Sequence, residues 1–426
     1  MDIHIITMSD STCLTSRLPQ ELLDYIIEKL WTDLPTLSSC ALVCRAFLPS
    51  SQAQFFSVIK LLPPTPSTKA PETRRLFQVL SEAPHLCPYV RNLHIHDGVS
   101  GDGVPHAFDS RWVALDTHLP RILQLLHNVQ YLSFRALDHD FHWYRLPAEL
   151  RAAVCDLTER SRLRNLSLDN LGRFTDLKEF SRLVASPVLQ TLGLHNVLLP
   201  DLAEERGRIV LDQVYLDSLR LAVRDEALEV AMNWLTQGAS LSQLRTLSLV
   251  APNSTSYIQR VTETCATSLE TFQLALKGEP SGYSANSCSG PLASLRSLRV
   301  LRITFLTTVT NQHIPWITDL LHPSPTPSAL SHLTFRIYLS TLNFVASLLP
   351  LDPAVWETLD RLLSEERFCA LEKVELDINY MNRFAEGIAR QYAGAAERGL
   401  HRLKARGVLN CAVASMHDPP KARSPD

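Results

Sequence analysis

The sequence predicts an α/β fold in which short parallel strands alternate with helices in a solenoid, behind an N-terminal cluster of short helices. Two observations predict the solenoid: an LxxLxL pattern of apolar residues recurs along most of the chain, and segments of helical periodicity lie between its copies. The helical spacing of apolar residues before position 62 predicts the cluster. A chain of 426 residues is also too long for one ordinary core, which favours several domains or stacked units.

The N-terminal cluster is predicted to span residues 17–62. Pro19 is suited to the start of a helix, and Leu22, Leu23, Ile26, Ile27 and Leu30 follow at helical spacing. After a turn at residues 33–35 a second helix is expected, with Pro49 as its stop, and a third apolar run covers residues 55–59. About 45 residues make a marginal free-standing domain, so this cluster is expected to share apolar surface with the rest of the chain or with a partner.

Composition divides the chain into five predicted segments. We expect a flexible start (residues 1–15), the helical cluster (16–62), a proline-rich connector with a first helix (63–87), the repeat region (88–412) and a disordered tail (413–426).

The LxxLxL pattern occurs eleven times. Its central spacings, from Leu163 to Leu298, are 26, 27, 28, 25 and 29 residues, close to the roughly 20 to 29 of leucine-rich repeats. We therefore predict a right-handed leucine-rich-repeat solenoid with a parallel sheet on the concave face and helices and loops on the convex face. The first positions are Val90, Val129, Leu163, Leu189, Leu216, Leu244, Leu269, Leu298, Leu330, Leu371 and Leu400.

Segments between the copies differ in character. Residues 177–184 and 227–235 show helical spacing, and 138–146, 281–290 and 353–368 are predicted insertions, of which the last is expected to form a helix. Only Asn170 and Asn196 come near the asparagine position of regular repeats, so the repeats are expected to be irregular.

Alternation along each strand separates core positions from outward ones. The leucines of the pattern form the core, and function is expected on the alternate positions. Arginine pairs with carboxylate and phosphate groups in a bidentate way, so an acidic or phosphorylated target is predicted, while an ordinary solvated face is an equally open interpretation. The candidate substrate-binding residues are Tyr131, Arg135, Arg220, Arg302 and Arg336, and the other outward positions considered are His94, Lys373, Glu375 and Arg402.

The first helices also resemble the F-box motif. The resemblance is carried by Leu18, Pro19, Glu21, Leu22, Leu23, Ile26, Ile27 and Leu30, followed by Leu42, Val43, Cys44, Arg45 and Phe47. The segment SCALVCRAFLPSSQAQFF is similar to F-box-like proteins abundant in mushroom-forming fungi, in which an irregular leucine-rich-repeat region commonly follows. Ala46 and Phe47 depart from the family, which frequently has a basic residue and a tryptophan there.

The resemblance implies a substrate-recognition subunit of a ubiquitin ligase. In that family the box docks onto a Skp-type adaptor, which leads to a cullin and a RING subunit, and the rest of the chain captures the target protein. Two alternatives stay open: a repeat scaffold whose first helices are only a cap, and an enzyme with a site built from loop histidines. The residues implied to contact or support the adaptor interface are Leu18, Pro19, Leu22, Ile26, Leu37, Val43, Cys44 and Arg45.

Other functional classes have little support. A formal net charge of -3 argues against nucleic acid, the 14 glycines form neither GxGxxG nor GxxxxGK[ST], and no catalytic motif is found, so no cofactor or catalysis is expected. Nine scattered cysteines, no export signal and no spanning segment indicate a cytoplasmic or nuclear protein. No bound metal is expected. The two groups of residues that could suggest a metal site are His85, Cys87, His94 and His96, and His139 with His142.

Overall fold

The structure is a computed structural model of the chain. It describes residues 18–64, 72–98, 112–137, 141–199, 215–223, 228, 230, 231, 233, 235, 241–251, 262–276, 292, 295–305, 313–321, 328–339, 353–381 and 383–416. The predicted flexible start, most of the connector, the 281–290 insertion and positions 417–426 of the predicted tail lie outside these residues. Among the described residues, no helix combines the length and the apolar character that crossing a bilayer requires.

The fold is α/β, and every strand is parallel to its hydrogen-bonded neighbours. The chain forms two compact units: unit 1 comprises Met1–Asp138 and Arg145–Arg164, and unit 2 comprises His139–Tyr144 and Asn165–Asp426.

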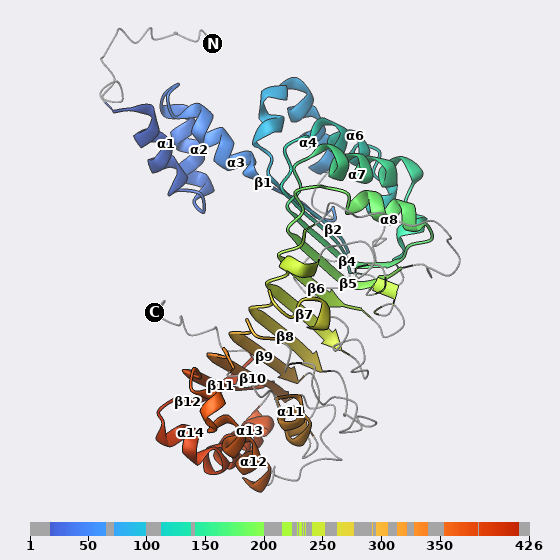
Figure 1. Ribbon diagram of the computed structural model, residues 1–426. Coiled ribbons are helices and arrows are strands. Elements are labelled where there is room, and N and C mark those ends of the chain that lie inside the picture. Colours follow the sequence, from blue (N-terminus) through green and yellow to red (C-terminus); the bar gives the residue numbers. More distant parts are fainter. Residues whose placement is uncertain are drawn as a thin grey trace, which may run out of the picture. The chain divides into compact units, whose positions relative to one another are not determined.

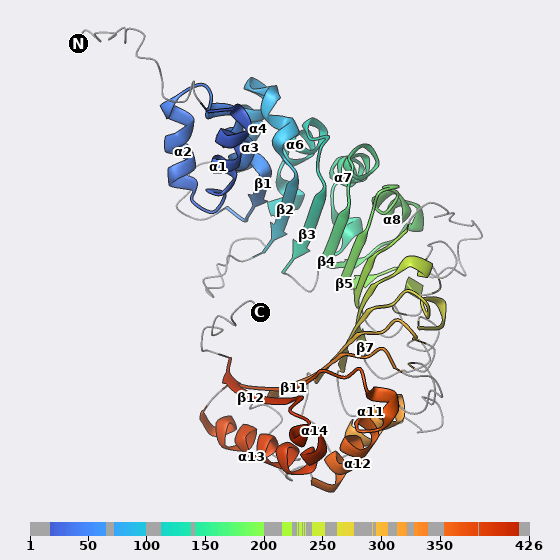
Figure 2. The ribbon, with the colours of Figure 1, turned by 60° about the vertical axis from the view of Figure 1, so that its left-hand side comes forward.

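Unit 1 contains three parallel strands and the N-terminal helices. Figure 2 shows α4, α6 and α7 on one side of the strands. Leu93, Ile95 and the equivalent residues of the neighbouring strands are buried on the side that these helices cover. The strands are β1 (Val58–Leu61), β2 (Asn92–Asp97) and β3 (Tyr131–Ala136). The helices are α1 (Gln20–Glu28), α2 (Leu34–Val43), α3 (Leu48–Ser57), α4 (Glu72–Glu82), η2 (Pro84–Tyr89), α5 (Trp112–Leu115), α6 (Leu119–Leu125) and α7 (Ala148–Arg160).

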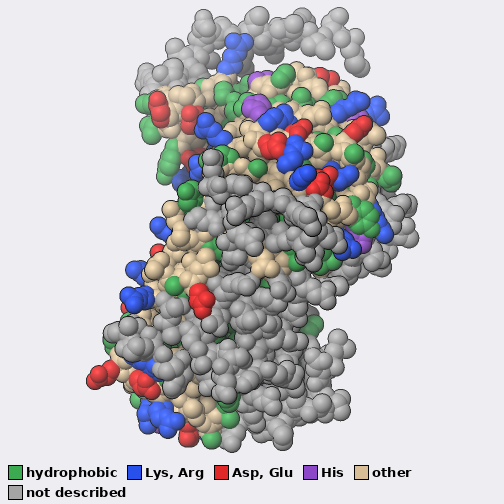
Figure 3. All heavy atoms as spheres, turned by 45° about the vertical axis from the view of Figure 1, so that its right-hand side comes forward, with side chains coloured by type: hydrophobic (Ala, Val, Ile, Leu, Met, Phe, Trp, Pro, Cys, Tyr) green, Lys and Arg blue, Asp and Glu red, His purple; other side chains and the backbone are tan. Residues whose placement is uncertain are grey.

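The helices that cover the strands of unit 1 have a surface of mixed charge. Over α4, α6 and α7, Figure 3 shows acidic and basic side chains interspersed. A surface of this kind produces no field of one sign, so it is typical of a solvated exterior.

Unit 2 is a nine-stranded parallel sheet whose strands follow one another in chain order (Figure 1). The strands are β4 (Asn165–Arg173), β5 (Thr191–Leu198), β6 (Ser218–Ala222), β7 (Thr246–Ala251), β8 (Thr271–Leu276), β9 (Val300–Phe305), β10 (His332–Leu339), β11 (Lys373–Tyr380) and β12 (Leu409–Ser415). The helices are η3 (Trp143–Arg145), at the passage of the chain between the units, α8 (Leu177–Leu183), η4 (Leu241–Gln243), α11 (His313–Leu321), α12 (Pro353–Leu363), η7 (Glu366–Phe368), α13 (Arg383–Gly399) and α14 (His401–Ala405).

The repeated pattern forms the core, as predicted. Ten of the eleven copies lie at strands β2 to β11, and all thirty of their apolar positions, three in each copy, are at most 5% exposed. Burial of a leucine-sized side chain stabilises a fold by about 1.5–3 kcal/mol, and each repeat obtains it only by stacking on its neighbours. The alternation therefore fixes which face of each strand is buried.

The two asparagines singled out by the sequence have left-handed backbone conformations. Asn170 has φ 57° and Asn196 has φ 49°, and Nδ2 of Asn196 donates to Oδ1 of Asn170 at 3.2 Å. Asparagine tolerates this conformation better than most residues do. This tolerance explains why Asn170 stands where the register shifts near the end of β4.

The predicted helices are largely confirmed. Residues 177–184 contain α8, and 353–368 contain α12 and η7. Of 227–235, the described positions 228, 230, 231, 233 and 235 are helical, and the others lie outside the described residues. Part of the predicted insertion 138–146 is structural, because Trp143 is fully buried and its ring stacks on Phe174 at 5.1 Å.

Several boundaries differ from the predictions. Pro49 does not end the second helix; α2 ends at Val43, and Pro49 lies in the first turn of α3, where its missing N–H costs nothing. The copy at Leu400 is not a strand, since His401–Ala405 form α14. The true last strand, β12, ends at Ser415, so residues 413–415 of the predicted disordered tail are ordered in the sheet.

The N-terminal cluster also contributes to the sheet of unit 1. The end of the predicted segment 16–62 is strand β1, which pairs with β2 from Val58 opposite Asn92 to Leu61 opposite Ile95. The short run Val58–Leu61 carries only two buried residues, Ile59 and Leu61, which is too little alternation to identify a strand in advance.

Candidate functional site

Exposed apolar side chains are concentrated on the N-terminal helices. Of the nineteen large hydrophobic side chains that are exposed in the described residues, twelve lie between positions 18 and 62. Patches of this kind on a folded domain mark interaction sites. We call the ten that precede β1 the apolar helix surface: Leu18, Leu22, Tyr25, Ile26, Trp31, Leu34, Leu42, Val43, Leu48 and Phe55.

Helix α1 has two apolar faces. Leu23 and Ile27, four residues apart, are buried against the cluster, whereas Leu22, Tyr25 and Ile26 are exposed together on another face. The N-terminal helices bury only one of these two apolar faces of α1 within their own fold. The second face of α1 is therefore available to a partner.

Polar contacts fix α1 against the segment that follows α2. The side-chain amide of Gln20 donates to the backbone oxygen of Ala46 at 2.9 Å. One turn later, Asp24 accepts from the hydroxyl of Ser50 on α3 and from Gln20 at 2.8 Å. The first turn of α1 and residues 44–46 are consequently brought together, although they are far apart in the sequence.

The structure places most of the predicted adaptor-binding residues on the surface. Leu18, Pro19, Leu22, Ile26, Val43 and Arg45 are exposed, and Cys44 is half-buried. Leu37 is the exception: its side chain is 0% exposed in the core between the helices. At this position Leu37 can support the surface residues of α2 by packing, but its side chain does not itself reach the surface.

Sequence reasoning missed the aromatic part of this surface. Trp31 is 66% exposed just after α1. Tyr25 lies three residues after Leu22 on the same face, and the ammonium group of Lys29 lies 4.6 Å from its ring centroid. The helical spacing between Leu22 and Tyr25 could have predicted that Tyr25 shares the exposed face of α1. The exposure of Trp31 could not be predicted in this way, because it depends on where the helix ends.

The stability of the cluster is expected to depend on pH in the acid range. Hydrogen bonds from Ser50 and Gln20 hold the pKa of Asp24 below its ordinary value of 3.8. A lowered carboxyl pKa stabilises the fold above the ordinary value and loses that contribution as pH falls through the folded-state pKa. In acid titrations followed by circular dichroism, Asp24→Asn should be less stable than the wild type at pH 7, and the difference should shrink as pH falls through the folded-state pKa of Asp24. An unchanged difference at both pH values would contradict this.

The outward face of the unit 2 sheet carries the other candidate residues. Its middle row joins Arg220, Ser248, Gln273, Arg302, Thr334 and Glu375 by strand register. Arg220 and Arg302 are exposed, lie three strands or about 14 Å apart, and contact no acidic side chain among the described residues. Around them the face is formed mostly by small or short polar side chains: Asn165, Ser167, Thr191, Gly193, Ser218, Thr246, Ser248 and Thr271.

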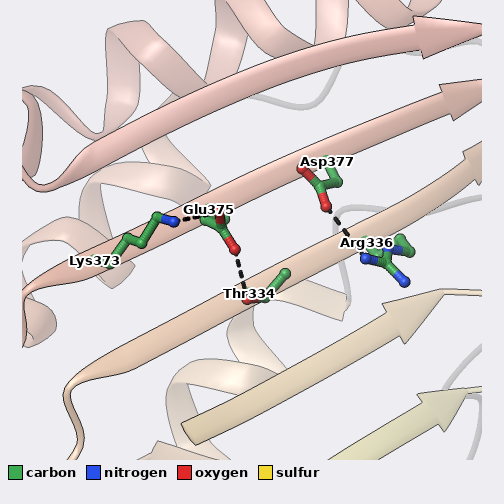
Figure 4. Close-up of polar contacts among 5 residues, drawn as sticks. All are labelled: Thr334, Arg336, Lys373, Glu375 and Asp377. Atoms are coloured by element: carbon green, nitrogen blue, oxygen red, sulfur yellow. Dashed lines mark hydrogen bonds and ion pairs between the residues drawn. The ribbon is translucent and has the colours of Figure 1, made fainter. Parts of the chain in front are cut away.

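Arg336 is in a different electrostatic setting. It forms an ion pair with Asp377 on the next strand, at 3.4 Å. Beside it, Glu375 accepts from Lys373 at 2.9 Å and from Thr334 at 3.2 Å. Figure 4 shows these two groups lying side by side on β10 and β11. Positive charges at this end of the face are therefore balanced within the sheet.

The five predicted substrate-binding residues do not form one site. Tyr131 and Arg135 lie in unit 1, and Arg220, Arg302 and Arg336 are spread over strands β6 to β10 of unit 2. His94, Lys373 and Glu375 are on outward positions as predicted, but Arg402 is not, because it lies on α14.

The described residues contain no assembled metal site, and two of their thiols are unreactive. No three of their histidine, cysteine and acidic side chains are grouped to hold a metal ion, and His139 lies outside them. Burial raises the pKa of Cys265 to about 12 and that of Cys411 to about 11. Both thiols stay protonated at neutral pH and are poor nucleophiles.

No family model matches the chain, and no curated protein sequence matches it significantly.

Proposed function

We propose that this protein is the substrate-recognition subunit of a Skp-cullin-F-box type ubiquitin ligase, in the cytoplasm or the nucleus. Helices α1–α3 are the F-box and dock a Skp-type adaptor, while the leucine-rich repeats hold a target protein on the outward face of their strands. The chain itself performs no chemistry: it tethers the target near the transferring enzyme and raises its effective concentration.

The apolar helix surface is the observation that carries this proposal. Ten exposed large hydrophobic side chains within about forty residues would be costly to leave in water, and they include the tyrosine and tryptophan that interfaces favour. The motif residues at the start of α1 and at positions 43–45 lie at one end of this surface, joined by the bond from Gln20 to Ala46. An apolar docking partner accounts for both facts.

The outward face of the strands supports the target-binding half of the proposal. Its small side chains leave the sheet accessible, and Arg220 and Arg302 offer exposed guanidinium groups to an acidic segment. Neither observation identifies a target, because outward positions are set by the partner and not by the fold.

A second candidate function is a ligase-independent scaffold in which α1–α3 cap the first strands. Helix α3 runs directly into β1 and packs on η2, and the backbone N–H of Arg91 donates to the oxygen of Ser57 at 3.1 Å. These contacts are those of a cap on the first strand. A cap alone leaves the exposed face of α1 unexplained.

Co-purification with a Skp-type adaptor tests the proposal. The full chain and the adaptor should elute together in size-exclusion chromatography, and the double variant Leu18→Ala with Pro19→Ala should bind at least about tenfold more weakly, as loss of interface anchors of this size does. Ile26→Asp should abolish binding, since it places a charge on the exposed apolar face of α1.

The matched control is Leu115→Asp. Leu115 is 69% exposed in unit 1 but lies on α5, outside the apolar helix surface. This variant should bind the adaptor like the wild type. If a well-folded wild type never binds, or if Leu115→Asp weakens binding as much as Ile26→Asp, the scaffold function replaces the ligase function.

A further inference from the structure

The outward face of the unit 1 strands is rich in basic groups. Four of its eight positions are basic and none is acidic: Val58, Lys60, Asn92, His94, His96, Tyr131, Ser133 and Arg135. At the β10–β11 end of unit 2, by contrast, the basic side chains lie beside Glu375 and Asp377 on the same face.

Strand register puts basic residues directly opposite one another. Lys60 on β1 is the register partner of His94 on β2. Groups of like charge at opposed positions destabilise a sheet when both are charged. A bound anion would remove this cost, so the arrangement favours a negatively charged ligand over an empty face.

His94 is at the centre of this group. Its ring lies 5.1 Å from that of Tyr131 and 6.2 Å from that of His96. The phenol of Tyr131 is a further hydrogen-bond donor on one side of His94, and Lys60, which is exposed, lies opposite His94 on the other side. Together Lys60, His94 and Tyr131 provide a charged group, an ionisable ring and a hydroxyl on one surface.

We propose that Lys60, His94 and Tyr131 form a binding site for a phosphorylated side chain of the target protein, and that the site binds more tightly when His94 is protonated. The identity of the ligand as part of a target rests on the proposed function, whereas the anion site itself does not.

The electrostatic surroundings of His94 link binding to pH. Burial lowers the pKa of His94 below its ordinary value of 6.5, and the charges of His96 and Lys60 lower it further. The other outward residues of the three strands are Val58, Asn92, Tyr131, Ser133 and the basic Arg135, and none of them carries a carboxylate. An anion held here favours the imidazolium and raises its pKa, so the affinity for an anion of constant charge must increase as pH falls from 8 to 5.

The test is a histidine titration of the full chain by NMR, with ¹³Cε1-labelled histidine and the His94 signal assigned from His94→Asn. Sulfate is the first probe, because its charge stays constant over this pH range. At constant ionic strength, saturating sulfate should raise the pKa of His94 by about one unit. Lys60→Met should reduce this rise by half or more.

Arg220→Met provides the matched control. It removes an exposed arginine from the outward face of unit 2 and leaves unit 1 intact, so the response of His94 to sulfate should be unchanged. If sulfate leaves the His94 pKa unaltered in the wild type, or if Lys60→Met responds like the wild type, the anion site is overturned.

A second probe distinguishes the source of the anion. N-acetyl-O-phosphoserine amide should bind several-fold more tightly than sulfate if a phosphorylated side chain is the ligand. Equal affinities would overturn that assignment in favour of a free inorganic anion. His94→Asn should still co-purify with the Skp-type adaptor, so failure of this site is distinguishable from failure of the ligase proposal.

Discussion

Replacing Gly172 by alanine is expected to lower the free energy of unfolding of unit 2 by about 2–4 kcal/mol. Gly172 has φ +58°, a conformation that costs an alanine about 1–2 kcal/mol. A Cβ at this position would also overlap the backbone oxygen of Phe141 and Nδ1 of His142. Neither neighbour moves easily, because Nδ1 of His142 already accepts from the backbone N–H of Arg173 at 3.2 Å.

Two other glycines separate the causes of this effect. Gly407 has φ +72° but open space around its Cβ position, so Gly407→Ala should show only the conformational cost. Gly193 has neither a positive φ nor a contact closer than 3.4 Å, so Gly193→Ala should be nearly neutral. Chemical denaturation followed by tryptophan fluorescence gives all three values. Equal losses for Gly172→Ala and Gly407→Ala would show that the overlap is relieved without cost.

Replacing Asp360 by alanine is expected to destabilise the C-terminal end of unit 2 by about 2–4 kcal/mol. Asp360 lies on α12 and is 0% exposed, and its two carboxylate oxygens accept from the backbone N–H groups of Arg402 and Leu403, each at 3.0 Å. These donors lie in the first turn of α14, which has no capping side chain of its own. Removing the carboxylate leaves the buried N–H of Leu403 and the part-buried N–H of Arg402 without this hydrogen-bond acceptor.

The change should be local and measurable by hydrogen exchange. Amides of α14 and β12 should lose protection in Asp360→Ala, because α14 leads directly into the last strand. Thr358→Ala is the matched control: it alters an exposed residue of the same helix, whose hydroxyl donates only within α12. If Asp360→Ala unfolds at the same denaturant concentration as the wild type, the carboxylate is not the cap of α14.

The apolar periodicity predicted the strands because burial alone decides those positions. Leu166, Leu168 and their equivalents need no knowledge of distant residues, since each repeat buries the same three positions against its neighbours. The pattern failed at Leu400 for a related reason. Leu400 and Leu403 are buried as the motif requires, but they are also three residues apart on a helical turn, and short apolar runs do not distinguish the two structures.

The polar side chains were less predictable because their partners come from other strands. Arg336 faces Asp377 because of the register between β10 and β11. A long segment of sequence separates these two strands, so the pairing could not be read from the sequence. The same holds for Lys60 opposite His94, since β1 itself was not foreseen. On the helices, the exposed residues of α1 followed from helical spacing, but the full burial of Leu37 follows only from how α2 and α3 pack.

The strand register of unit 2 also bears on how its binding preferences can change. Arg220 and Arg302 lie three strands apart with Ser248 and Gln273 between them, so substitutions at the two sites should contribute additively to affinity. Arg336 and Asp377 are coupled and must be varied together. Evolution or an engineer can therefore alter the face one strand at a time, while the buried leucines beneath stay the same.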